Sequence, residues 1–314
     1  MSATALDVVV VTFDTREVTL ECLARLDREG TRAIVVDNGS SDGTAAAVAE
    51  RFGEAVVVRL PEGVGFAEAC NRGAAAGDAP LVLFLNSDVY ARPGALDVLV
   101  RALEERADAV AAGGRLVDPG TDDTQPAYAP QRFPGLAELV ARVTGLEVVL
   151  GRWLAPDPEL LAERGTVACD QPAGACLLVR RDALEAVGGW DERYWFWYED
   201  VDLARRLQER GVLLHVGAAV FEHLGGGTFA AWGRERGLRS RLHGIATYAE
   251  THLGAVSRRV LGLALVASGA LRWVAFTLLR RRELAAAWLD GARLGARLAG
   301  PRRRSAARRR AGAT

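Results

Sequence analysis

The 314-residue sequence predicts an α/β fold in which a mostly parallel central sheet is flanked by helices. Short apolar runs alternate with longer amphipathic stretches over residues 8–116, which is the rhythm of βαβ units. The run at 81–85 contains only apolar residues, as expected of a strand covered on both faces. Acidic residues stand at the ends of two of these apolar runs. Their position predicts a ligand-binding edge of the sheet, because such sheets bind ligands beyond the carboxyl ends of their strands.

The elements of the first half follow from this pattern in chain order. The predicted strands cover 8–13, 33–37, 55–60, 81–85 and 109–116. The predicted helices cover 16–28, 43–52, 66–76 and 93–106, the last with Pro93 in its first turn. Residues 117–134, rich in Pro, Asp, Thr and Gln, predict a mobile loop. The second half is predicted to contain a strand at 175–179, a glycine turn at 188–189, a helix ending near 210 and a strand at 212–216.

Charge is distributed unevenly along the chain. The net charge is −1, yet residues 255–314 contain fourteen arginines and only two acids, Glu283 and Asp290. An acidic body followed by a basic end predicts that the end meets an anionic partner. The four cysteines show no zinc-binding spacing, so we expect buried free thiols. No basic, cleavable leader precedes the first strand, and we therefore expect the body in the reducing cytoplasm.

The segment EGVGFAEA (62–69) matches a dinucleotide-binding fingerprint only in part. Gly63 and Gly65 supply the first two glycines, but Glu68 stands where a third small residue should allow close packing. The segment also follows the third predicted strand rather than the first. Its glycines are equally expected to shape a strand-to-helix turn, which disfavours a nicotinamide oxidoreductase.

Six segments together resemble family 2 glycosyltransferases of the GT-A fold. They are VVVVTFDT, IVVDNGSSDGT, GVGFAEACNRG, LFLNSDV, PAGACLLVRRDALEAVGGWDE and YEDVDLARRL, in the family's order and spacing over residues 8–206. Within that family the chain is most similar to bacterial rhamnosyltransferases, which also share a His-x-x-Gly-Gly feature. The resemblance implies metal-dependent, inverting transfer of a sugar from a nucleotide-diphosphate donor, with dTDP-rhamnose as the candidate. The implied acceptor is a lipid-linked glycan or polysaccharide of the cell envelope.

The resemblance assigns a metal site to Asp88 and His223. Asp88 is the last position of a modified Asp-x-Asp motif, and Asn86 replaces its first acid, so the site has one carboxylate fewer. Mg²⁺ or Mn²⁺ takes one or two carboxylates together with phosphate oxygens and water. Asn86 and Asp88 are also assigned to nucleotide-sugar binding. The alternatives are a simple turn at 86–88 and a structural histidine at 223.

The same resemblance assigns Asp37 to the base of the nucleotide, with Thr12 and Phe13 lining the pocket. The alternative for Asp37 is an N-cap of the following helix, although Asp42 is better placed for that role. Arg72 is expected to neutralise phosphate or to hold the base. An exposed helical arginine is an equally good interpretation of it.

Three acidic residues lie at the start of a predicted helix, where the helix dipole favours negative charge: Glu199, Asp200 and Asp202. Removing the proton of a sugar hydroxyl is work for a positioned carboxylate. The resemblance assigns Asp200 as the catalytic base, Glu199 as its reserve and Asp202 as a supporting residue. The alternative is a plain acidic first turn. The aromatic residues of 190–198 are expected mostly in the core, with one ring at most facing the acceptor.

Residues 260–279 form an apolar stretch long enough to cross a bilayer, but Arg272 interrupts it. Arginines at 258–259 and 280–282 flank this stretch, and a further helix is predicted at 283–298. We expect both helices to lie on the inner face of the membrane with arginines facing anionic lipid. A true span and a nucleic-acid-binding tail are the alternatives, and the apolar content argues against nucleic acid.

The predicted organisation is a catalytic domain at 1–253, a membrane-associating helical segment at 254–300 and a basic disordered tail at 301–314. The predicted partners are a nucleotide-sugar donor, a lipid-linked acceptor and an anionic membrane surface, with no nucleic acid. A non-catalytic, membrane-docked nucleotide-sugar-binding protein remains the alternative function.

Overall fold

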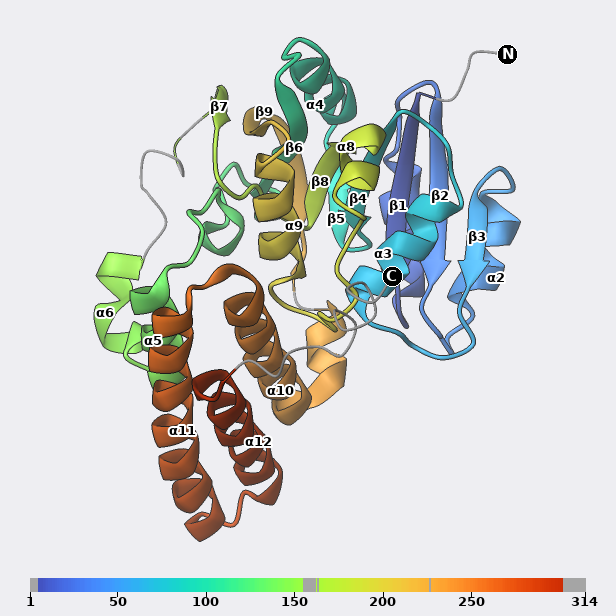
Figure 1. Ribbon diagram of the computed structural model, residues 1–314. Helices are drawn as coiled ribbons and strands as arrows, with labels where there is room; N and C mark the ends of the chain where they lie inside the picture. Colours follow the sequence, from blue (N-terminus) through green and yellow to red (C-terminus); the bar gives the residue numbers. More distant parts are fainter. Residues whose placement is uncertain (1–4, 155–161, 163, 226, 302–314) are drawn as a thin grey trace, which may run out of the picture. The chain divides into compact units, whose positions relative to one another are not determined.

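The computed structural model describes residues 5–154, 162, 164–225 and 227–301 (Figure 1). The described chain forms two compact units. The first runs to Pro134 and resumes over Arg152–Gly233, and the second comprises Gly135–Gly151 and the residues from Arg234 onward. The predicted tail at 301–314 lies outside the described residues, apart from Pro301.

The first unit is built on a sheet of nine described strands. They are β1 (Leu6–Thr12), β2 (Thr31–Asp37), β3 (Val56–Arg59), β4 (Leu81–Asn86), β5 (Val89–Ala91), β6 (Ala109–Val117), β7 (Thr166–Ala168), β8 (Cys176–Arg180) and β9 (Val212–His223). The order is β3-β2-β1-β4-β8-β6-β9-β5, and β7 also pairs with β9. The pairs among β1 to β4 are parallel, as is β6 with β9.

The remaining pairs are antiparallel, so the sheet is mixed. Strand β8 lies between β4 and β6 and runs opposite to both. Strands β5 and β7 each run antiparallel to β9. The α/β class with a central sheet flanked by helices is confirmed. The alternating rhythm predicted the parallel part, but it contained no signal for the direction of β8.

The described helices of the first unit are α1 (Arg16–Ala24), α2 (Thr44–Arg51), α3 (Phe66–Ala75), α4 (Ala95–Glu104), the 3₁₀ turn η1 (Pro126–Tyr128), α8 (Arg181–Ala186) and α9 (Glu199–Gln208). Five of them follow the predicted pattern with small shifts, whereas η1 and α8 were not predicted. Helix α1 ends earlier than predicted, because the N–H groups of Arg25 and Leu26 bond three residues back and tighten the last turn. Pro93 precedes α4 rather than entering it, since Gly94 adopts a left-handed conformation.

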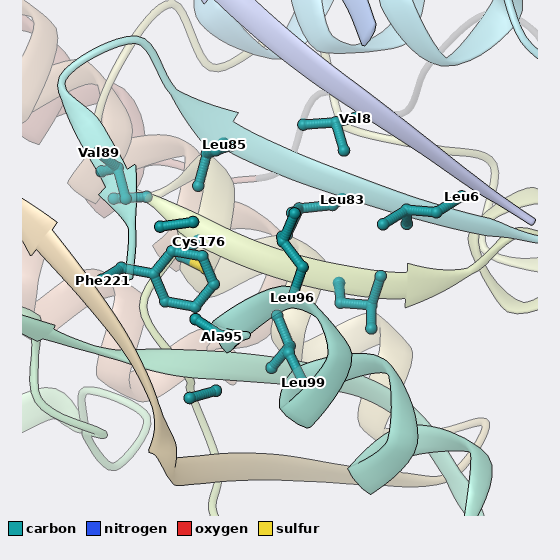
Figure 2. Packing of buried hydrophobic residues seen from close by; sticks show 14 of the residues in the cluster. Leu6, Val8, Leu83, Leu85, Val89, Ala95, Leu96, Leu99, Cys176 and Phe221 are labelled. Atoms are coloured by element: carbon teal, nitrogen blue, oxygen red, sulfur yellow. The ribbon is translucent and has the colours of Figure 1, made fainter. Parts of the chain in front are cut away.

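The sheet buries apolar side chains on both faces. Val8 and Val10 of β1 pack in one cluster with side chains of α1, α2 and α4, and Figure 2 shows part of this cluster. Val9, which points to the opposite face, packs in a second cluster with α3, α8 and α9. Burial on both faces explains why these strands contain uninterrupted apolar runs.

The strand register brings the predicted site residues to one edge. Thr12 at the end of β1 pairs with Asp37 at the end of β2. Val11 pairs with Asn86 at the end of β4. Because the three strands are parallel, their polar ends meet at the carboxyl edge of the sheet, as the sequence predicts.

A buried ion cluster stabilises the opposite end of β1. The Asp7 carboxylate is fully buried and accepts hydrogen bonds from Arg32 Nε at 2.7 Å, Arg181 Nη2 at 2.7 Å and the backbone N–H of Ala79 at 2.9 Å. These contacts join β1, β2 and α8, which are distant in sequence. The carboxylate therefore holds three segments together away from the ligand-binding edge.

We expect Asp7→Asn to lower the free energy of unfolding by roughly 3 kcal/mol, because breaking a buried pair leaves a charge uncompensated. Urea unfolding measures the loss. Asp78→Asn is the matched control, since Asp78 also pairs with Arg32 but is exposed, and we expect at most about 1 kcal/mol there. Equal stability of the two variants would show that the cluster contributes nothing beyond a surface pair.

The second unit is helical. Its elements are α5 (Leu136–Thr144), α6 (Glu147–Leu154), most of α10 (Gly227–His252), α11 (Ala255–Leu278) and α12 (Arg282–Ala299). Helix α10 is kinked at Gly233, where the chain passes from one unit to the other. Helices α11 and α12 cover the two stretches predicted to be helical at 260–279 and 283–298.

Glycines allow α11 and α12 to pack closely. A Cβ at Gly262 would lie 2.6 Å from the carbonyl oxygen of Gly295, and one at Gly269 would lie 2.8 Å from that of Trp288. The Arg272 side chain of α11 also has partners inside this unit. Its Nη2 donates to the carbonyl oxygen of Thr144 at 2.6 Å, and its guanidinium lies over the Trp288 ring. The charge that interrupts the apolar stretch is thus held at the C-terminus of α5, where the helix dipole favours a cation.

Candidate active site

The pairing of β5 with β9 brings Asp88 and His223 together. Val89 pairs with His223, and the N–H of Leu224 donates to the carbonyl oxygen of Asp88 at 3.0 Å. Asp88 Oδ1 consequently lies 3.5 Å from His223 Nε2. The histidine side chain is 1% exposed and the aspartate side chain 19% exposed, so the carboxylate opens toward solvent while the imidazole is enclosed.

Two residues of the segment predicted as a mobile loop complete this part of the site. Gln125 hydrogen-bonds both the ring and the backbone of His223. The Tyr128 ring meets the His223 ring edge-on, with centroids 4.3 Å apart. Neither residue was predicted to belong to the site, because no periodic pattern of residues distinguishes it. Only their position after β6 indicated a place near the site, because the carboxyl end of β6 lies beside the end of β9.

Arg115 of β6 anchors the segment that contains Gln125 and Tyr128. Arg115 is buried and donates to the carbonyl oxygen of Gly217 at 2.8 Å and to the Asp122 carboxylate at 2.7 Å. These bonds fix residues 118–125 over the end of the sheet. Residues 117–134 are therefore an irregular but extensively hydrogen-bonded segment.

Asp200 lies in the first turn of α9 and is half-buried. Its Oδ1 accepts the N–H of Val201 at 2.8 Å, and its Oδ2 lies 3.5 Å from Gln171 Nε2. Gly174 allows the close approach, because a Cβ there would lie 2.7 Å from Asp200 Oδ2. Burial raises the pKa of Asp200, and the surrounding hydrogen bonds oppose this rise. A carboxylate with a raised pKa is better matched to accept a proton near neutral pH.

Glu199 occupies a different environment from its neighbour. It is buried, and its Oε2 has no hydrogen-bond partner among the described residues. Burial and the charge of Asp200 raise its pKa well above the ordinary value. Burial raises the pKa of Cys70 on α3, and the charge of Glu199 raises it further. The enclosure of Glu199 favours Asp200 as the base, in agreement with the order of preference taken from the sequence.

Tyr128 links the two acidic parts of the site. Burial raises the pKa of its hydroxyl, and the charges of Asp88 and Asp200 raise it further. Both carboxylates therefore lie within electrostatic reach of one ring.

Asp37 and Asn38 shape the neighbouring edge of the sheet. Asp37 is buried, and its Oδ1 accepts the N–H of Ser40 at 2.9 Å. Asn38 bonds Val64 in both directions, at 2.8 and 3.0 Å, which ties the 62–65 loop to the end of β2. Gly63 approaches the backbone of Asn38 too closely for an unstrained side chain. The glycines of EGVG thus serve backbone packing.

The other assigned nucleotide residues differ in exposure. Thr12 is buried, and its hydroxyl lies 2.8 Å from that of Thr19. Phe13 is half-buried at the same edge. Asp42 accepts the N–H of Thr44, the first residue of α2, but the N-cap of that helix is Gly43, so Asp37 does not cap it.

Arg72 and Asn86 complete the assigned set. Arg72 is exposed on α3, where its guanidinium pairs with Glu68 at 3.1 Å. This is the geometry of an ordinary helical surface pair. Asn86 ends β4, and its backbone N–H donates to the carbonyl oxygen of Ala175 at 3.0 Å, which aligns the end of β4 with the turn before β8.

The aromatic run before α9 divides between core and surface. Trp190 is buried against Phe84, with ring centroids 5.0 Å apart. The rings of Trp195 and Trp197 are 38% and 40% exposed. Trp197 and Tyr198 both have positive φ angles, 74° and 71°, an uncommon conformation for bulky residues that is often found at functional sites.

Asp202 supports the turn that carries this run. It is fully buried, and Arg206 Nε donates to it at 2.7 Å. Arg206 Nη1 also donates to the carbonyl oxygens of Val187 at 2.9 Å and Gly189 at 2.7 Å. Asp202 therefore acts through Arg206 on the turn at 188–189, as the supporting role predicted for it implies.

The cysteine thiols are poorly suited as nucleophiles. Cys22, Cys70 and Cys176 are buried and Cys169 is half-buried, and burial raises the pKa of each thiol above its ordinary value. A thiol that stays protonated at neutral pH is a poor nucleophile and a poor metal ligand. Cys22, Cys70 and Cys176 are the buried free thiols that the sequence predicts.

Asp88 and His223 fit a divalent cation that receives its remaining ligands from the substrate. No group of three or more His, Cys, Asp or Glu side chains suited to a metal occurs among the residues that the structure describes. A site supplied with only two side chains is normal for Mg²⁺ or Mn²⁺ bound with phosphates. The open side of Asp88 leaves room for such a ligand.

Comparison with known proteins agrees with this geometry. The family model described as "Glycosyl transferase family 2" matches residues 7–188. An N-acetylglucosaminyl-diphospho-decaprenol L-rhamnosyltransferase of Mycobacterium tuberculosis (strain ATCC 25618 / H37Rv) is 33% identical over 274 residues, which cover 79% of this chain and 85% of that relative.

Solved structures share the fold at lower identity. S. aureus TarS (residues 1–349) in complex with UDP-GlcNAc has a TM-score of 0.58 at 15% identity, covering 94% of this chain and 82% of that one. The mannosyltransferase PcManGT of Pyrobaculum calidifontis, in complex with GDP-Man and Mn²⁺, has a TM-score of 0.51 at 17% identity, covering 94% and 88%.

The mixed α/β sheet and its likeness to these structures define the GT-A fold. The chain belongs to glycosyl transferase family 2, because the family model covers more than half of it. Its relatives include rhamnosyltransferases.

Proposed function

We propose that this glycosyltransferase moves rhamnose from dTDP-rhamnose to a lipid-linked glycan in cell-envelope synthesis, with inversion at the transferred carbon. The observation that carries the proposal is the pairing of the Asp88 carboxylate with His223, beside the Tyr128 ring. This pair is suited to a cation, and Asp200 in the first turn of α9 is the candidate base. The mycobacterial relative supports the choice of sugar and of a lipid-diphosphate acceptor.

Different residues of the site bind the donor, hold the cation and accept the proton during the transfer. Asp37, with Thr12 and Phe13, holds the nucleoside end of the donor at the edge of β1 and β2, and Asp88 with His223 would hold Mg²⁺ or Mn²⁺. When bound, that ion supplies Lewis-acid stabilisation of the negative charge on the departing diphosphate. Asp200 accepts the proton of the acceptor hydroxyl as its oxygen bonds to the sugar carbon and the carbon–phosphate oxygen bond breaks. The exposed Trp195 or Trp197 ring offers a surface for the acceptor sugar.

A donor screen tests the proposal. The full-length protein is mixed with dTDP-rhamnose, UDP-GlcNAc or GDP-mannose, with and without Mn²⁺, and thermal stability is measured. We expect the largest Mn²⁺-dependent stabilisation with dTDP-rhamnose, because a ligand that binds only the folded state raises its stability. Stabilisation by another donor alone would replace the sugar assignment.

Transfer to a synthetic polyprenyl-diphosphate-GlcNAc separates the enzyme from the alternative, a non-catalytic nucleotide-sugar-binding protein. Donor binding without any glycosylated product would favour that alternative. The raised pKa values of the buried Glu199 and the half-buried Asp200 favour catalysis, since shifted carboxyl pKa values cluster at catalytic sites.

We further propose that the helical unit docks the enzyme on the cytoplasmic face of the membrane, against anionic lipid. Helix α11 is the one helix among the described residues that is long and apolar enough to cross a bilayer. One side of α11 packs on α12, and the opposite side exposes a stripe of apolar residues: Val256, Val260, Leu263, Leu271, Val274 and Leu278. Arginines 280–282 lie exposed at its end, where they could meet lipid phosphate.

Helix α6 adds a second apolar surface to this unit. Val148 and Val149 are among its most exposed apolar residues, while Glu147 between Leu146 and Val148 pairs with Arg241 of α10. Arg272 also opposes a span, since its partners on α5 would have to enter the hydrocarbon with it. These features favour an interfacial position for α11.

We expect Leu263→Asp combined with Leu271→Asp to reduce flotation of the full-length protein with anionic vesicles at least tenfold, since both changes charge the apolar stripe. Arg51→Ala with Arg101→Ala is the matched control, because it changes net charge equally on the other unit and should leave flotation nearly unchanged. Full flotation of the aspartate variant would exclude the stripe as the docking surface. Retention of the wild type in membranes after carbonate washing would indicate a span instead.

A further inference from the structure

The hydrogen bonds around Gln125 fix the orientation of its side-chain amide. Its Nε2 lies 2.8 Å from the carbonyl oxygen of His223 and 2.7 Å from Asp118 Oδ1, two atoms that can only accept. That end must therefore be the NH₂ group, and both of its protons are used. Reversing the amide would place an oxygen against two acceptors and lose both bonds. The opposite end, Oε1, can only accept.

This orientation decides which ring nitrogen of His223 carries the proton. Gln125 Oε1 lies 2.7 Å from His223 Nδ1, so Nδ1 must be the donor. In the neutral imidazole, Nε2 then carries a lone pair. Nε2 faces Asp88 Oδ1 at 3.5 Å, so two electron-pair donors oppose each other without a proton between them. Such a pair is suited to a cation.

Packing holds the imidazole ring of His223 in this orientation. The imidazole is 1% exposed, and the Tyr128 ring closes one side of it. The N–H of Gln125 donates to the carbonyl oxygen of Leu116 at 2.9 Å, which ties Gln125 to the end of β6. The amide and the imidazole therefore hold each other on a backbone that is itself anchored to the sheet.

We propose that Gln125 is a positioning residue that selects the Nδ1–H tautomer of His223, so that Nε2 can bind the divalent cation together with Asp88. The inference rests on the proposed metal-dependent function and adds to it a residue outside the motifs of the family resemblance. Partners that orient a metal-ligating histidine are typically worth 10–100-fold in metal affinity.

The tautomer is measured directly on the metal-free, full-length protein labelled with ¹⁵N-histidine. Long-range ¹H–¹⁵N spectra distinguish Nδ1–H from Nε2–H, and His223→Asn identifies the signals of His223 among the four histidines. We expect Nδ1–H in the wild type and Nε2–H in Gln125→Leu. Gln131→Leu is the matched control from the same segment and should retain Nδ1–H.

Mn²⁺ binding, followed by the electron paramagnetic resonance of the free ion, supplies the second measurement. We expect Gln125→Leu to weaken Mn²⁺ binding 10–100-fold and Gln131→Leu to leave it within about twofold. Gln125→Glu combined with Asp118→Asn exchanges the donor and acceptor toward residue 118 and keeps an acceptor for Nδ1–H, but it loses the bond to the carbonyl oxygen of His223. This variant should keep Nδ1–H and bind Mn²⁺ more tightly than Gln125→Leu, though less tightly than the wild type.

Each result has a defined meaning. An Nε2–H signal for His223 in the wild type, or an unchanged signal in Gln125→Leu, overturns the proposal. A changed tautomer with unchanged Mn²⁺ affinity also overturns it, because His223 would then not be a ligand. If Gln125→Leu fails to fold, the double variant decides, since loss of Nδ1–H there contradicts the selection by an acceptor at 125. Failure of the tautomer test leaves the proposed transfer reaction standing, since that reaction is tested by its product.

Discussion

Asp200→Asn is expected to lower the rate of sugar transfer by about 10²–10⁴, the usual contribution of a positioned general base. Asparagine retains an oxygen for the N–H of Val201 and nearly the same volume beside Gly174, so the start of α9 should be preserved. Donor binding should change little, because it depends on the edge formed by β1, β2 and β4. Transfer assays and donor titrations on the same preparations separate the two effects.

The pH dependence provides a second test of the same residue. Burial raises the pKa of Asp200, and a protonated carboxyl cannot accept the acceptor proton. The wild-type rate should therefore fall as the pH drops through this raised pKa, and Asp200→Asn should lack that acidic limb. A raised pKa also means that the charged form costs stability at higher pH. The variant should consequently be at least as stable as the wild type at neutral pH.

Glu199→Gln is the matched control for Asp200→Asn. Glu199 is enclosed and its Oε2 has no described partner, so we expect a smaller effect on the rate than for Asp200→Asn. If Glu199→Gln abolishes transfer while Asp200→Asn retains it, the two roles must be exchanged. If both variants remain active, the acids only begin α9 and the base lies elsewhere.

Asp88→Asn is expected to abolish detectable transfer and to remove the Mn²⁺ dependence of nucleotide binding. Asn86 already supplies an amide where the related motif has a carboxylate, so Asp88 is the carboxylate of the pair that it forms with His223. Its replacement leaves a neutral amide oxygen and one imidazole nitrogen, and a hard cation such as Mg²⁺ loses the only carboxylate of the pair. Nucleotide affinity with and without Mn²⁺, together with turnover, measures the loss.

Asp97→Asn controls for the loss of one negative charge, because Asp97 is an exposed residue of α4 outside the site. It should retain both transfer and metal dependence. The fold of Asp88→Asn should remain intact, since the β5–β9 pairing involves the backbone of Asp88 rather than its carboxylate. Full metal-dependent binding and turnover in Asp88→Asn would remove the metal assignment from this residue.

The family motifs predicted most of the edge of the sheet correctly, because they are local. Asp37 and Asn86 were expected at the ends of strands, and the parallel register places them at one edge. The structure also separates residues that the motifs treated alike. Arg72 belongs to a surface pair with Glu68, whereas Asn38, which was not singled out, binds the 62–65 loop through both ends of its amide.

The sequence by itself determined the α/β class, most of the strands and helices up to residue 116 and the acids at the strand ends, because periodicity and turn chemistry depend on residues close together in the chain. Only the tertiary structure decided the antiparallel position of β8, the partners of Arg272 and the approach of Gln125 to His223. Each of these is a contact between segments far apart in sequence. Such contacts are set by burial and hydrogen bonding across the fold, and no local pattern in either segment records its partner.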